Sequence, residues 1–261
     1  MEQLKMLRED IAQCDEIICS ALVMRNRLIE EIMAYKEQNN LPILQPEQEL
    51  KQRNKLKEML KNKDHQKEVI AVFDTIIHNS KKIQARKLFD YNIVLIGFMG
   101  AGKTTISNYL STLFAMEIIE MDEIIAKREG MSIPDIFEVH GEEYFRDAET
   151  NLLIEMQQKT NHVISCGGGV PLRERNVAEM KKNGKVVLLT ASPETIFDRV
   201  KDDHGRPVIE NNKNIPFIAD LMEKRRAKYE AAADIIITTD NKSELEICEE
   251  LVQRLMEDFA K

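Results

Sequence analysis

The stretch from Ile93 to Thr105 reads IVLIGFMGAGKTT and decides the fold of the chain around it. A short apolar run leads into a glycine-rich turn and then into the start of a helix. Gly97, Gly102, Lys103 and Thr104 match the G-x-x-x-x-G-K-[ST] pattern of a phosphate-binding loop. Glycines let backbone N–H groups turn toward one anion, and the helix that follows points its positive end at the same place. An ordinary glycine turn is the alternative, but the strand–loop–helix order is the one that the motif requires.

Composition narrows the class of protein. Hydrophobic residues make up 43% of the 261 residues and charged residues 31%, which is ordinary for a globular protein. The net charge of −8 argues against a nucleic-acid partner. No apolar run is long enough to cross a bilayer and no basic-then-apolar leader opens the sequence, so we expect no membrane partner and a cytoplasmic location. The four cysteines lack metal-ligand spacing, and we expect reduced, buried thiols at Cys14, Cys19, Cys166 and Cys248.

The first 90 residues contain no glycine, which favours an all-helical domain. Apolar residues recur at steps of three and four from Leu4 to Tyr35 and predict one helix about 50 Å long. A second helix is expected from Pro46 to about residue 61, and a third from about residue 66 to 88. Three helices of such unequal length close no good core within one chain. We therefore expect an intertwined homodimer.

Beyond Asp90, short apolar runs alternate with helical stretches. The expected strands are 93–96, 117–120, 163–166, 186–189 and 235–238. The expected helices are 104–114, 122–128, 142–158, 173–182, 193–201, 215–232 and 243–259. Strands rich in β-branched residues and separated by helices predict a five-stranded parallel sheet covered on both faces. The chain thus divides into a helical domain, 1–90, and an α/β domain, 91–261.

Four further features follow the phosphate loop. Asp122 comes after the second expected strand, at the sheet edge where ligands bind, although it could simply cap a helix. Arg146 lies in GEEYFRD, where a surface ion pair is the alternative. Three glycines at 167–169 would let a small ligand approach the backbone, unless they form a plain turn. Arg206 lies in a polar loop of the kind that closes over a nucleotide.

Together these residues resemble shikimate kinase. The matching motifs are GFMGAGKTT at 97–105, the acidic pair ending at Asp122, GEEYFRD at 141–147, GGG at 167–169, RP at 206–207 and KRxxxY at 224–229. They are collinear and cover residues 91–261.

The resemblance implies transfer of a phosphoryl group from ATP to shikimate, giving shikimate 3-phosphate, with Mg²⁺ as cofactor. It implies ATP-binding roles for Gly100, Ala101, Gly102, Lys103, Thr104, Thr105, Arg199 and Arg206. It implies shikimate-binding roles for Asp122, Arg146, Gly167, Gly168, Gly169 and Arg225. Lys103, Asp122 and Arg206 would be catalytic, and Thr104 would hold Mg²⁺. Glu120 stands where the family usually has Asp and would reach the metal through water.

The helical segment resembles type II chorismate mutase, the all-helical class. The match rests on LREDIAQCDE at 7–16, Arg25, Lys36, LPI at 41–43, Glu49 and the pair Ser80 and Gln84. It implies conversion of chorismate to prephenate. Chorismate would be bound by Arg8 of the other subunit and by Arg25 at the carboxylates, by Lys36 and Gln84 at the ether oxygen, by Glu49 at the hydroxyl, and by Ser80. Without the resemblance, Arg25 and Lys36 would read as solvated charge on a helix.

One departure leaves two hypotheses open. Gln48 stands where the family commonly has an active-site arginine, and Gln45 replaces a usual acid. The chain is therefore either a bifunctional shikimate-pathway enzyme, or a shikimate kinase whose helical domain is a weak or inactive module for dimerisation or regulation. A kinase for another small polyol acid is a further alternative.

Overall fold

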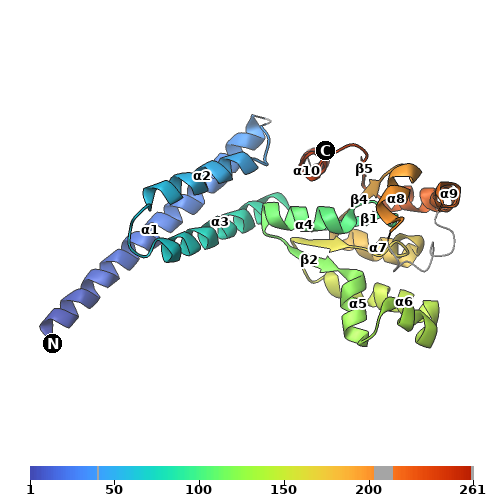
Figure 1. Cartoon of the computed structure of the whole chain (residues 1–261), viewed down its shortest axis with the longest axis horizontal. Coiled ribbons are helices and arrows are strands. Elements are labelled where there is room, and N and C mark those ends of the chain that lie inside the picture. The colour runs from blue at the N-terminus through green and yellow to red at the C-terminus, as the bar shows by residue number, and fades with distance from the viewer. Residues whose placement is uncertain (40, 203–213, 260–261) are drawn as a thin grey trace. The chain divides into compact units, whose positions relative to one another are not determined.

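The computed structural model describes residues 1–39, 41–202 and 214–259 (Figure 1). The chain divides into two compact units, Met1–Lys87 and Leu88–Lys261. We call them the helical unit and the α/β unit. Among the described residues, no helix combines the length and the hydropathy needed to span a bilayer.

The helical unit consists of α1 (Glu2–Gln38), α2 (Pro46–Met59) and α3 (Gln66–Leu88). Proline is favourable at the start of α2, where its missing N–H would have no partner in the helix. Side-chain contacts hold the helices together: Arg25 of α1 donates to Ser80 of α3, and Arg53 of α2 pairs with Asp74 of α3 at 2.7 Å.

The first half of α1 carries an uncovered apolar stripe. Every residue from 1 to 20 is exposed. The large apolar residues exposed along the helix include Leu4, Leu7, Ile11, Ile18, Leu28 and Ile32. Cys14 and Cys19 are exposed as well, so the expectation of buried thiols is wrong for these two. They lie on a stretch of helix that nothing in the described part of the chain covers. Cys166 and Cys248 are buried as expected.

The α/β unit is built on a parallel sheet of five strands in the order β2-β3-β1-β4-β5, which confirms the predicted fold class. The strands are β1 (Asn92–Gly97), β2 (Glu117–Glu120), β3 (His162–Ser165), β4 (Gly184–Thr190) and β5 (Ile235–Thr238). β1 is buried along its whole length and pairs with both β3 and β4. Its continuous apolar run reflects that central position.

Seven α-helices and one short 3-10 helix flank the strands in the described part of the α/β unit. They are α4 (Lys103–Phe114), α5 (Met121–Glu129), α6 (Ile133–Met156), η1 (Val170–Leu172), α7 (Glu174–Lys182), α8 (Pro193–Val200), α9 (Ile215–Ala232) and α10 (Glu244–Phe259). The helix expected from residue 142 instead begins at Ile133 and continues through a kink at Gly141, whose φ is +85°. Ser132 caps its start by accepting from the backbone N–H of Asp135.

Gly97 ends β1 and begins the phosphate loop. Its φ is +149°, a conformation that side chains rarely adopt, and a Cβ there would clash with the backbone carbonyl of Leu189 on β4. The chain can leave the sheet at this point because residue 97 has no side chain.

We expect Gly97→Ala to lower the free energy of unfolding by about 2 to 4 kcal/mol, because backbone strain and the clash with a fixed carbonyl add. Gly130 is the matched control. Its φ is +68° but nothing lies within 4 Å of a Cβ there, so Gly130→Ala should cost only about 1 kcal/mol. Urea denaturation of the two variants checks the difference, and equal losses would contradict the role of the clash.

Candidate active site

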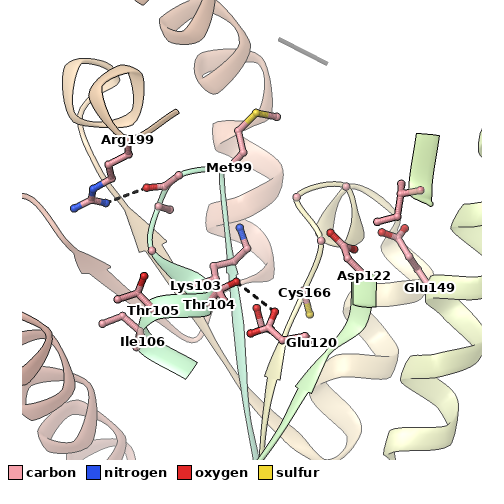
Figure 2. A pocket seen from close by; sticks show the side chains of 18 of the residues that line it. Met99, Lys103, Thr104, Thr105, Ile106, Glu120, Asp122, Glu149, Cys166 and Arg199 are labelled. Carbon is pink, nitrogen blue, oxygen red and sulfur yellow. Dashed lines mark hydrogen bonds between the residues drawn. The ribbon is translucent and has the colours of Figure 1, made fainter. Parts of the chain in front are cut away.

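A cavity of about 1000 Å³ lies where β1, β2 and β3 end (Figure 2). In parallel sheets, this carboxyl edge is where ligands bind. Of the kinase-type residues predicted from the sequence, all but Arg206 line this one cavity. Arg206 lies outside the described residues.

The phosphate loop forms one wall of the cavity. Gly100 and Gly102 have φ values of +76° and +98°, and Gly102 is the N-cap of α4. The Lys103 ammonium folds back over the loop, where Nζ donates to the carbonyl oxygens of Gly97 at 2.9 Å and of Phe98 at 3.1 Å. This wall thus combines a helix N-terminus with a cation, which is the combination that binds phosphate.

Three oxygen-bearing side chains meet at the start of α4. The Thr104 hydroxyl donates to Oε2 of Glu120 at 3.4 Å, and the Ser107 hydroxyl donates to Oε1 of the same carboxylate at 2.7 Å. Figure 2 shows Thr104 and Glu120 facing each other. Hydroxyl and carboxylate oxygens suit a hard cation such as Mg²⁺. Among the described residues, no three His, Cys, Asp or Glu side chains form a metal cage, so a cation here would also need phosphate or water ligands.

Arg199 of α8 closes another side of the loop. Its Nη1 donates to the carbonyl oxygen of Gly100 and to the hydroxyl of Thr239, both at 3.0 Å. The Thr239 hydroxyl lies within hydrogen-bonding distance of the Ala101 carbonyl, at 3.3 Å. The segment after β5 thus completes this wall of the cavity, although no sequence motif pointed to it.

Arg146 lies on α6, 43 residues after Lys103 of the phosphate loop, and lines the same cavity. Its guanidinium contacts Glu149 at 2.9 Å and Glu142 at 3.0 Å, and its side chain is only 18% exposed. The ring of Phe145 lies 5.6 Å from the Arg146 Cζ. Burial lowers the pKa of the guanidinium, but the two carboxylates outweigh this and the pKa is raised. The alternative of an ordinary surface ion pair is therefore wrong for Arg146.

Glu149 is a functional candidate that the sequence did not reveal. Its side chain is fully buried, and burial raises the pKa of its carboxyl to about 7 against the attraction of Arg146. It lies one helical turn after Arg146, so the two groups share a face of α6. The only feature of the sequence that could have pointed to this pair is a glutamate three residues after Arg146.

Asp122 and Glu149 both approach the backbone of Gly167. A Cβ on this glycine would lie 2.6 Å from Oδ1 of Asp122 and 3.0 Å from Oε1 of Glu149. Figure 2 shows the two carboxylates beside each other at one end of the cavity. Glu120, not Asp122, is the N-cap of α5, so the capping alternative is wrong. The glycine run also lets the Arg146 side chain approach the backbone closely, because a Cβ on Gly169 would overlap its guanidinium.

Arg225 of α9 faces the same cavity from another element. Its guanidinium carbon lies 5.8 Å above the ring of Phe98. Tyr229, one turn later, donates to the carbonyl of Gly168 at 2.6 Å. Burial raises the pKa of the Tyr229 phenol, while the charges of Arg225 and Arg146 oppose the shift. Both guanidinium groups therefore lie near the Tyr229 phenol, and both line the cavity.

The helical unit joins two of its predicted residues directly and covers most of the others in part. Arg25 donates to Ser80, and Lys36 donates to the carbonyl of Ile43 at 2.9 Å. Burial lowers the pKa of both Arg25 and Lys36. Glu49 and Gln84 are half-buried, whereas Arg8 is exposed.

Comparison with known proteins agrees with this geometry. Residues 99–256 match the family model described as shikimate kinase. The chain belongs to the shikimate kinase family. Residues 7–85 match the family model of chorismate mutase type II, so a chorismate mutase domain precedes the shikimate kinase domain.

Individual relatives cover the α/β unit. Shikimate kinase of Dehalococcoides mccartyi is 42% identical over 164 residues, which are 63% of this chain and 93% of that protein. A solved shikimate kinase from Acinetobacter baumannii, in complex with shikimate, superposes with a TM-score of 0.61 at 32% identity and covers 66% of this chain and 96% of its own. Shikimate kinase from Aquifex aeolicus gives a TM-score of 0.54 at 35% identity, with coverages of 65% and 98%.

The raised pKa of Glu149 predicts a pH-dependent stability. Between its ordinary pKa of 4.5 and about 7, the folded chain holds a proton that the unfolded chain releases. Stability from this group is therefore present below about pH 4.5 and is lost as the pH rises through 7. Glu149→Gln cannot ionise, so the free energy of unfolding of the variant should rise relative to that of the original chain between pH 5 and pH 8.

Urea denaturation at a series of pH values checks this. Glu155, which forms an exposed pair with Arg128, supplies the control Glu155→Gln. Curves for Glu149→Gln that run parallel to those of the original chain across this range would show that the carboxyl does not titrate there.

Proposed function

We propose that the α/β unit transfers the γ-phosphoryl group of ATP to the 3-hydroxyl of shikimate in the cavity described above. The observation that carries this proposal is that Arg146 and Arg225, from different helices, line the same cavity as the phosphate loop. Two guanidinium groups suit a carboxylate at one end of an acceptor. The loop with Lys103 suits the phosphates at the other end.

Each polar group then has a role. Lys103 would move from the carbonyls of Gly97 and Phe98 to the phosphates of ATP, where it neutralises the charge that develops during transfer. Asp122 would hold the acceptor hydroxyl and accept its proton. The nucleotide would also contact Gly100, Ala101, Gly102, Thr105 and Arg199, and Gly167 and Gly168 would contact the ring hydroxyls. Arg206 keeps its proposed role at the transferring phosphoryl group.

Magnesium fits the pair of side chains at the start of α4. The Thr104 hydroxyl would be a direct ligand, and Glu120 would hold a metal-bound water. Glu120 already accepts hydrogen bonds from Thr104 and Ser107, so its orientation is fixed from both sides. The metal would supply charge neutralisation at the phosphates.

Glu149 would act through Arg146 and not on the substrate. Its two oxygens accept from Nη1 of Arg146 at 3.1 and 2.9 Å, and Glu142 accepts from Nε and Nη2 at 3.2 and 3.0 Å, so the two carboxylates together fix the plane of the guanidinium. A fork held in one plane loses less entropy when it binds a carboxylate.

Two variants test the kinase assignment. Lys103→Met should reduce kcat for ATP-dependent phosphorylation of shikimate about 10³-fold, since it removes a cation from the transferring group. Arg146→Ala should raise the KM for shikimate about 10- to 100-fold while kcat changes little, since a charged hydrogen bond contributes about 1.5 to 3 kcal/mol.

Arg128→Ala is the matched control, because this arginine is half-exposed and pairs with Glu155 on the surface. Steady-state kinetics with shikimate and with acids that carry fewer hydroxyls checks both variants. Full activity of Lys103→Met, or a better turnover of another polyol acid, would refute the assignment.

We propose further that the helical unit rearranges chorismate to prephenate as a homodimer. Arg25, Lys36, Glu49, Ser80 and Gln84 are half-buried or buried on three helices of one chain. No nucleophile is needed, because the reaction only requires a reactive conformer and stabilised negative charge. The opposing hypothesis, a weak or inactive regulatory module, rests on Gln48 and Gln45, both of which are exposed.

The length of α1 supports the dimer. Arg8 and Arg25 are 17 residues apart on the same helix, which at about 1.5 Å per residue separates them by about 25 Å. One chorismate molecule cannot span that distance, so Arg8 would have to come from a second copy. The exposed apolar stripe of α1 would be covered by the same association.

Subunit mixing tests shared sites. Arg8→Ala and Arg25→Ala should each abolish prephenate formation in the full chain. When both variants are refolded together, half of the dimers carry one intact site of two, so roughly a quarter of the original activity should return. No recovery, in dimers shown by ultracentrifugation to have mixed, would contradict a site shared between copies.

A further inference from the structure

The helical unit contains a largely covered cation that none of the predicted roles uses. Nζ of Lys81 on α3 lies 2.7 Å from Oε2 of Glu49 on α2. The Lys81 side chain is only 16% exposed, whereas Lys5 and Lys61, which pair on the surface of the same unit, are 79% and 66% exposed. A lysine covered to this degree is unusual without a role for its charge.

Lys81 lies among the residues proposed to bind chorismate. It directly follows Ser80, which accepts a hydrogen bond from Arg25, and it precedes Gln84 by three residues. Residues three and four apart share a helix face, so this edge of α3 presents Ser80, Lys81 and Gln84 together. Lys81 reaches from that edge to the one acidic residue of the proposed site.

Comparing the charge of chorismate with that of the proposed site shows why a further cation matters in the helical unit. Chorismate carries two carboxylates. Without Lys81, the site residues of one chain are Arg25 and Lys36 against Glu49, which leaves a single net positive charge. On α2, the position next to Glu49 is an exposed and uncharged Gln48, which adds no positive charge to this set. Lys81 brings the local net charge to two.

We propose that Lys81 supplies, from α3, the positive charge that α2 lacks at Gln48, and that its ion pair holds Glu49 oriented toward the substrate hydroxyl. This inference rests on the proposed binding of chorismate by the helical unit. Attraction for a dianion acts on the bound substrate and on the transition state alike, so its loss raises KM more than it lowers kcat.

The test uses Lys81→Gln in the full chain, with prephenate formation as the readout. We expect the KM for chorismate to rise about tenfold or more while kcat stays within about threefold. Lys67→Gln removes the same charge from an exposed position of α3 and should change neither constant. Gln48→Arg, added to Lys81→Gln, should bring KM back to within about threefold of the original value, which a purely structural lysine would not allow. Shikimate phosphorylation by the same samples reports on their integrity.

The outcomes separate this inference from the mutase assignment. If the original chain forms prephenate and Lys81→Gln matches Lys67→Gln, Lys81 has no such role and the mutase stands. A loss that Gln48→Arg fails to restore overturns the charge replacement. If the original chain forms no prephenate, equilibrium binding of chorismate decides: weaker binding by Lys81→Gln supports the inference, equal binding overturns it, and no binding by the original chain overturns both.

Discussion

The buried ion pair between Arg146 and Glu149 is the interaction on which the acceptor side of the proposed kinase site depends. Glu149 is fully buried, and because burial outweighs the attraction of Arg146, the pKa of its carboxyl is raised to about 7. A buried pair of this kind contributes little net stability, because desolvation offsets the attraction. What it provides is position: the guanidinium lies against the backbone of Gly169, where any side chain would overlap it.

The two domains arrange charge for their substrates in different ways. In the shikimate kinase domain, the carboxyl edge of one rigid sheet gathers the phosphate loop, Asp122 and two arginines within a single chain. In the chorismate mutase domain, a small set of buried apolar residues, such as Ile29 and Met33, packs beside a few polar contacts, such as that between Arg25 and Ser80. In the proposed dimer, a second copy would cover the apolar stripe of α1 and add contacts to this unit.

The sequence predicted those features that are local. The phosphate loop is a continuous motif, and the alternation of strands and helices follows from apolar runs, so the parallel sheet was predictable. The first half of α6 was not predicted, because a glycine such as Gly141 usually ends a helix. Here the helix kinks at Gly141, whose φ and ψ are not helical, and resumes after it. Glu149 and Lys81 were not predictable as candidate site residues either. A charged residue on a helix reads as solvated until the fold shows what covers it. The exposure of Cys14 and Cys19 likewise depends on tertiary cover, which periodicity cannot report.

The resting position of Lys103 has a consequence for the thermodynamics of nucleotide binding. Its ammonium is already held by two backbone carbonyls of the loop, those of Gly97 and Phe98. Immobilising a lysine costs up to about 2 kcal/mol of side-chain entropy. Here that entropy is lost when the chain folds, so capture of a triphosphate exchanges one set of oxygen acceptors for another. The enthalpy of that exchange, more than the ordering of a free side chain, would set the temperature dependence of the affinity.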